Sequence, residues 1–190
     1  MSGFVFGSPT TWSIHEKKLS FTGDDFRIED DAGNTVARAK GKVFSIRDRT
    51  TFTDERTGAE IFTTYFKQFS MSDTVYIERA GQVLATIRGD VCGCPPTFRC
   101  YRGEADFSWG NESDAPVLYE AEAKCCRNRS RTFFDASGEE CASTHERRCN
   151  DLFCGTDEYD VECEPGVDCA MIWAMTIAID NIIEAKQNNN

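Results

Sequence analysis

The sequence has few of the residues, and none of the motifs, around which enzyme active sites are usually built. Its 190 residues include only two histidines, His15 and His145. It contains no G-x-S-x-G sequence, no phosphate-binding P-loop and no glycine-rich dinucleotide loop. A Cys–His dyad at His145 stays open, because nothing in the sequence selects the cysteine. We therefore expect a protein that is not an enzyme and that has no cofactor.

Basic residues are also in short supply. Lys and Arg total 21 against 32 Asp and Glu, which gives a formal net charge of −11. General nucleic-acid binding is not expected, because it requires a basic surface to neutralise phosphates. The acidic pairs at residues 24–25 and 30–31 lie at turns without EF-hand spacing, so no metal site, and in particular no calcium site, is expected at these pairs. Residues 1–9 lack the features of a signal peptide, so we expect a cytoplasmic protein, with peripheral membrane contact left open.

Cysteine is absent from the first 91 residues, yet ten cysteines lie between Cys92 and Cys169. No pair among them has zinc-knuckle spacing. The pattern leaves open reduced thiols, disulfides and a metal site. Cys92, Cys94, Cys125 and Cys126 are also candidates for S-acylation.

A helix of unusual composition is predicted near the end of the chain. Between residues 169 and 179 only Thr176 is polar. A helix that is apolar on all sides must be enclosed, and this run is shorter than the roughly 20 residues of a membrane span. Pro165 and Gly166 break the preceding strand, and Asp168 is a favourable N-cap. These signals predict a buried helix over about residues 167–185 and no transmembrane span.

Short strands separated by turn residues are predicted for the rest of the chain. Residues 26–29 alternate apolar and charged side chains, as a half-buried strand should. Two halves, at about residues 12–90 and 97–163, resemble each other, which predicts one domain over residues 1–190 built from a repeat. An offset of 81 residues relates three pairs of positions: Phe26 and Phe107, Val36 and Val117, Phe52 and Phe133.

Roughly twelve strands and one apolar helix predict a closed arrangement. Closing a sheet removes its exposed edges. A barrel of this size has a lumen too wide for its own side chains to fill, and the helix is the only candidate to fill it. The expected fold is mainly β, a closed barrel of about twelve strands that encloses a hydrophobic C-terminal α-helix.

Three stretches give the chain a resemblance to a known family: residues 26–34, residues 40–48, and residues 165–168 with the helix that follows. Together they resemble the LURP-one-related family, which shares the tubby C-terminal-like fold with tubby proteins and phospholipid scramblases. The resemblance implies a twelve-stranded barrel around a C-terminal helix. For function, it implies an association with plant defence, phosphoinositide binding as in tubby proteins, or a link to membrane lipids and calcium as in scramblases.

From this resemblance we expect a non-catalytic interaction module in stress or defence signalling. Its expected partner is a phosphoinositide, another anionic membrane lipid, or a protein. Two alternatives stay open. One is a scramblase-like protein that takes part directly in lipid movement, and the other is a redox or metal-responsive protein that uses the cysteines of the second half.

Two groups of basic residues form the predicted head-group site. They are Lys40, Lys42, Arg47 and Arg49 in the first half, and Lys124, Arg127, Arg129 and Arg131 in the second. Alternate residues of a strand share a face, so a hairpin would bring the first four cations together. The second group lies near the repeat-equivalent place, which would allow one face to hold both groups. The alternative is a solvated strand face that Asp48 and Asp54 neutralise.

Overall fold

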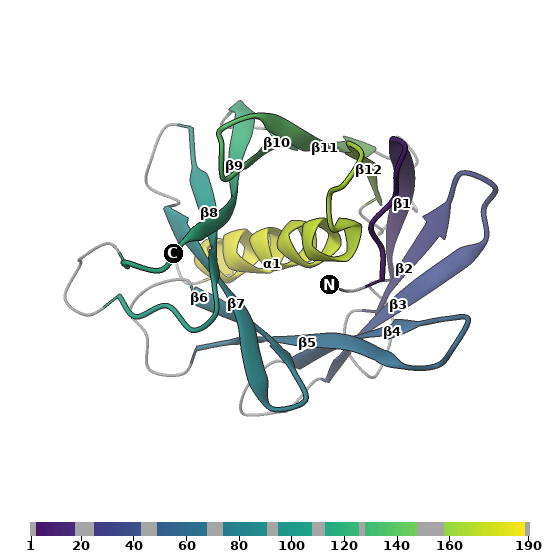
Figure 1. Ribbon diagram of the computed structural model, residues 1–190, viewed down its shortest axis with the longest axis horizontal. Helices are drawn as coiled ribbons and strands as arrows, with labels where there is room; N and C mark the ends of the chain where they lie inside the picture. The colour runs from purple at the N-terminus through teal and green to yellow at the C-terminus, as the bar shows by residue number, and fades with distance from the viewer. Residues whose placement is uncertain are drawn as a thin grey trace.

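The computed structural model describes residues 3–17, 25–42, 49–67, 74–90, 95–107, 113–125, 128–147 and 158–188. These residues form twelve strands and one helix: β1 Thr10–Lys17, β2 Asp25–Asp30, β3 Thr35–Lys42, β4 Arg49–Asp54, β5 Glu60–Phe66, β6 Thr74–Arg79, β7 Gln82–Asp90, β8 Thr97–Arg102, β9 Val117–Cys125, β10 Asn128–Asp135, β11 Glu140–Arg147, β12 Glu158–Cys163 and α1 Cys169–Asn188. Each strand pairs antiparallel with its neighbours in the chain, and β1 pairs with β12 to close the barrel (Figure 1). The predicted closed barrel with a C-terminal helix is confirmed.

Helix α1 runs through the middle of the barrel (Figure 1). Most of its described apolar side chains are buried, with Met171 and Ile183 partly buried, and Trp173 and Met175 have no exposed surface. Inward-facing residues of the strands, such as Ile28 and Phe52, surround it and are also fully buried. Burial of each such side chain stabilises the fold by about 1.5–3 kcal/mol, so the helix and the wall stabilise each other. No helix among the described residues is both long and apolar enough to cross a membrane.

The helix begins where the sequence predicts. Asp168 precedes its first residue, and the Asp168 carbonyl accepts hydrogen bonds from the N–H groups of Met171 and Ile172 at 3.0 and 3.3 Å. Residues 3–9 run beside this end of the helix. The carbonyls of Phe4 and Phe6 accept hydrogen bonds from Cys169 and Gly166, so the segment is fixed to the start of the helix.

The two ends of the barrel differ in their strand pairing. We call the end where the even-numbered strands finish and α1 begins the helix-start end. Five hairpins connect strands there, and each contains a β-bulge, in which one residue of the outgoing strand has no partner across the ladder. The five residues are all apolar: Val36, Ile61, Leu84, Leu118 and Cys141. Bulges bend and twist their strands, so this end of the barrel differs in shape from a regular one.

Candidate functional site

The first predicted group of cations lies at the barrel end opposite the helix-start end. Lys40 is exposed on β3, and Lys42 is the ladder partner of Arg49 on β4. The Arg49 guanidinium lies 3.3 and 3.4 Å from the two carboxylate oxygens of Glu78 and 4.7 Å from the centre of the Tyr65 ring. Glu78 therefore offsets the charge of Arg49. The side chain of Lys42, and Arg47 as a whole, lie outside the described residues.

The acidic residues that were expected to neutralise this group do not do so within the described residues. Asp54 is the last residue of β4, at the helix-start end. Its carboxylate accepts hydrogen bonds from the N–H groups of Arg56 and Thr57 at 2.8 and 2.9 Å. These bonds lower the pKa of Asp54 below its ordinary value, with the bond from Thr57 as the largest cause. Asp48 lies outside the described residues.

The second predicted group lies on a different wall. In the order of strands around the barrel, β9–β10 lies six strands from β3–β4, so the two groups do not share one wall. Arg131 is only 5% exposed, and its Nη1 donates to the Ser130 carbonyl at 3.1 Å. It is two residues before the fully buried Phe133, so it faces the lumen. The side chains of Lys124 and Arg129, and all of Arg127, lie outside the described residues.

The side chains of the four acylation candidates lie outside the described part of the chain. Cys92, Cys94 and Cys126 lie outside the described residues, and Cys125 is described only as the last backbone position of β9. The four cysteines whose side chains are described are free thiols and are buried: Cys100, Cys141, Cys163 and Cys169. No group of three His, Cys, Asp or Glu side chains in the described part of the chain is placed to hold a metal ion.

Buried thiols of this kind are poor nucleophiles. Burial raises the pKa values of Cys100 and Cys141 to about 12, so both stay protonated at neutral pH. Cys169 differs, because a hydrogen bond with the Cys163 side chain lowers its pKa below the ordinary value of a thiol. Cys169 is nevertheless only 1% exposed, and its sulfur lies 3.5 Å from the hydroxyl of Thr10.

Neither histidine forms the Cys–His dyad that the sequence left open, as far as the described residues extend. His15 lies between two carboxylates, with Nε2 3.2 Å from Glu29 and Nδ1 3.0 Å from Glu158. His145 is exposed, whereas the described cysteines are buried. No described cysteine hydrogen-bonds to either ring, so these residues provide no activated nucleophile.

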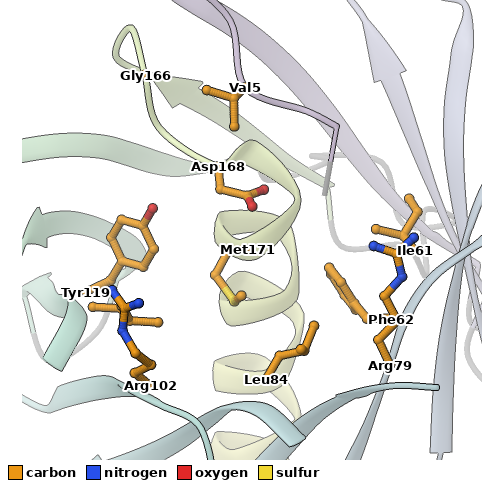
Figure 2. Close-up of a pocket in the computed structure, with 11 residues that line it drawn as sticks. Val5, Ile61, Phe62, Arg79, Leu84, Arg102, Tyr119, Gly166, Asp168 and Met171 are labelled. Atoms are coloured by element: carbon orange, nitrogen blue, oxygen red, sulfur yellow. The ribbon is translucent and has the colours of Figure 1, made fainter. Parts of the chain in front are cut away.

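A cavity of about 360 Å³ lies at the helix-start end, between the first turn of α1 and the strands β5 to β9 (Figure 2). Ile61 and Phe62 of β5, Leu84 of β7, Leu118 of β9 and Met171 of α1 form its apolar walls. Three of these five, Ile61, Leu84 and Leu118, are bulge residues. The bulges thus add to the wall an apolar side chain that strict alternation would turn to the outside.

The rim of the cavity is charged. Arg79 and Arg102, the last residues of β6 and β8, are exposed and lie on either side of the helix (Figure 2). No described carboxylate lies within 4.0 Å of either guanidinium. By contrast, five other arginines of the described part are paired with Asp or Glu: Arg27, Arg38, Arg49, Arg99 and Arg147. Among the described residues, the two rim arginines thus differ from these five in having no carboxylate partner.

Two further polar groups complete the rim. Burial raises the pKa of Tyr119 to about 12, so the phenol keeps its proton at neutral pH. Its oxygen accepts a hydrogen bond from the backbone N–H of Asp168, which leaves the O–H available as a donor. The carboxylate of Asp168 also borders the cavity (Figure 2). Two guanidinium groups and one carboxylate give the rim a net positive charge, on a chain whose formal charge is −11.

The sequence analysis does not predict this cavity, although the sequence contains one signal for it. Apolar residues occur in adjacent pairs at the start of three strands: Ile61 with Phe62, Leu84 with Ala85, and Leu118 with Tyr119. Such pairs interrupt the alternation of a half-buried strand, and this interruption is typical of a bulge. Nothing in the local sequence marks Arg79 and Arg102 as partners.

Comparison with known proteins gives consistent results. The profile of the LURP-one-related family matches residues 10–180. Protein LURP-one-related 15 of Arabidopsis thaliana is 23% identical over 181 residues, which cover 92% of this chain and 80% of that protein. An X-ray structure of an Arabidopsis thaliana protein superimposes with a TM-score of 0.65 at 19% identity and covers 96% of each chain. At that identity the structural likeness shows the fold alone.

Proposed function

This chain belongs to the LURP-one-related family, and on that premise we propose that it is a non-catalytic module that binds an anionic ligand at the helix-start end. The observation that supports this function is the pair of arginines, Arg79 and Arg102, at the rim of one cavity without a described carboxylate partner. The proposal includes a cytoplasmic protein that meets membranes peripherally.

The chemistry of the rim favours a ligand with a single negative charge. Guanidinium groups bind carboxylates and phosphates through charge-assisted, often bidentate, hydrogen bonds. The Tyr119 hydroxyl can donate a further bond to the same group. Asp168 opposes a second negative charge, because like charges at short range repel each other. A carboxylate or a phosphodiester therefore suits this rim better than a doubly charged phosphate.

The proposed function is tested by comparing hexanoate with 1-hexanol, which has nearly the same shape but no charge. Hydrogen bonds to charged groups contribute about 1.5–3 kcal/mol, so hexanoate should bind at least tenfold more tightly in isothermal titration. Arg79→Gln/Arg102→Gln should abolish this difference. The control Arg56→Gln/Arg147→Gln removes the same net charge from exposed residues outside the cavity and should leave the difference intact. Equal binding of the two compounds by the unaltered protein would refute the function.

The cations of the β3–β4 hairpin provide a second candidate site for a membrane-lipid head group. Lys40 is exposed, and Lys42 faces Arg49 across the ladder. Cosedimentation with phosphatidylcholine vesicles, with and without phosphoinositide, tests this site. A Lys40→Gln/Lys42→Gln variant that loses phosphoinositide-dependent binding, beside an Arg79→Gln/Arg102→Gln variant that keeps it, would assign the head group to the hairpin. The scramblase-like and cysteine-based alternatives stay predictions.

A further inference from the structure

The apolar walls of the cavity narrow the class of ligand beyond its charge. We propose that the ligand is a single-chain amphiphile, with one carboxylate or phosphate group at the end of an alkyl chain. Its anionic group lies between Arg79 and Arg102, and its chain lies in the cavity against Met171. This inference rests on the proposed function, because it assumes that the two arginines bind the anion.

The exposure of apolar side chains supports a chain inside the cavity. Leu84, Leu118 and Met171 are only partly buried although they face one another around the same space. Val5 lies at the edge of that space and has a relative surface exposure of 37%. It is the one large apolar residue among the described residues that is exposed. Exposed apolar side chains that gather in one place usually mark a binding site, and an alkyl chain would cover all four.

The size of the cavity favours one chain over two. At about 30 Å³ for a group the size of a water molecule, 360 Å³ holds roughly a dozen non-hydrogen atoms. This volume is at the low end of the range for small-molecule sites, about 300–1,000 Å³. One chain of about ten carbons fills it, whereas the two long chains of a membrane phospholipid do not fit. Met171 can adjust to chains of different shape, because its thioether is flexible and polarisable.

The site is also held open before any ligand arrives. The segment that contains Val5 is fixed on both sides, since the Phe4 and Phe6 carbonyls accept hydrogen bonds from Cys169 and Gly166 at 3.0 and 2.8 Å. The Phe4 ring packs edge-on against Trp173 at 4.9 Å. A preformed cavity loses little entropy when a ligand binds, which favours binding of a small molecule with few polar contacts.

The test is a series of straight-chain carboxylates, from acetate to tetradecanoate, titrated below their micelle concentrations. Each buried methylene should tighten Kd about fourfold, and this gain should end near ten carbons because the cavity is then full. Leu84→Trp fills part of the cavity and should shorten the chain length at which the gain ends. Val83→Trp, on the preceding residue outside the cavity lining, is the matched control and should leave the series unchanged. The series on the unaltered protein decides the question even if Leu84→Trp fails to fold.

The outcomes separate this inference from the function on which it rests. Binding that depends on Arg79 and Arg102 but does not improve with chain length would overturn the inference and keep the proposed function. Binding that still improves from ten to fourteen carbons, or is unaffected in folded Leu84→Trp, would place the chain outside the cavity and overturn it too. If no carboxylate binds at any length, the proposed function fails and the inference fails with it.

Discussion

Replacing Trp173 with phenylalanine should destabilise the barrel much less than the same replacement at Trp12. Both indoles are buried, at 0% and 6% exposure, and their rings meet edge-on at 5.0 Å and 76°. Their N–H groups differ. Trp12 Nε1 donates to the Thr10 hydroxyl at 3.1 Å, whereas Trp173 Nε1 is buried and has no hydrogen-bond partner among the described residues.

The magnitudes follow from these contacts. Each replacement removes buried ring atoms equivalent to two or three methylene groups, which costs about 2 kcal/mol at about 0.8 kcal/mol per group. At Trp173 the loss is offset by removing an unsatisfied buried N–H, whose burial costs about 1–3 kcal/mol. At Trp12 a hydrogen bond worth about 1 kcal/mol is lost in addition. The free energies of unfolding of the two variants should therefore differ by about 2–4 kcal/mol.

Urea unfolding followed by far-UV circular dichroism measures this difference without relying on tryptophan fluorescence. A Thr10→Val variant provides the control. It removes the acceptor of the Trp12 bond, so its effect should not add to that of Trp12→Phe. The reasoning is refuted if Trp173→Phe costs as much as Trp12→Phe. That result would mean that a neighbouring ring face, that of Phe4 or Trp12, accepts the Trp173 N–H.

Three smaller changes test the local structure of the wall. Gly89→Ala would place a Cβ 2.9 Å from two ring carbons of Phe98, so it should lower the free energy of unfolding by about 1–3 kcal/mol; unchanged thermal unfolding would show that the ring can move aside. Ala80→Gly should stabilise the β6–β7 turn by about 0.5–1 kcal/mol, because Ala80 has a φ of 50°, and a lower melting temperature would contradict this reasoning. Hydrogen bonds lower the pKa of Asp135, and the bond from the Ser137 hydroxyl is the largest cause. The ionised Asp135 therefore stabilises the fold above the ordinary pKa of an aspartate, and this stabilisation is lost as the pH falls below about 4. Asp135→Asn should therefore unfold with a weaker dependence on pH between 3 and 5, and a dependence equal to that of the unaltered protein would show that the bonds do not act in the folded state.

The fold could be predicted because the sequence shows directly which segment has to be buried. A helix with only Thr176 polar between residues 169 and 179 has to be enclosed, and a dozen short strands provide the enclosure. Thr176 meets the same requirement in the structure, since its hydroxyl donates to the Ile172 carbonyl at 2.8 Å inside the helix. Neither inference needs contacts between distant residues, and both follow from side-chain pattern alone.

The site could not be predicted in the same way, because it depends on register. Arg79 and Arg102 end two strands that are not ladder partners, and they border one cavity because β6 and β8 both pair with β7 and finish at the same end of the barrel. The predicted clusters were chosen mainly by charge, and less by the face of the strand on which each side chain lies. Arg131 is two residues before Phe133, so alternation already placed it on the buried face with that ring. Arg49 lies on the face of its strand that the prediction gave it. Its partner Glu78, however, comes from β6, two strands away in the sheet.

The position of the cavity follows from how the helix fills the barrel. The side chains of α1 from residue 172 to residue 180 are buried, and the cavity lies beside the first turn of the helix, at one end of the barrel. Five bulges occur at the helix-start end, and their extra residues occur around much of its circumference. Near β1, Phe6 packs against Trp12 at 5.5 Å, and residues 3–9 supply apolar side chains to that part of the end. Near β5 to β9, the bulge residues Ile61, Leu84 and Leu118 border the cavity instead. Chains of this fold with the same bulges but bulkier side chains at the positions of residues 3–9 should therefore have a smaller cavity and bind shorter amphiphiles.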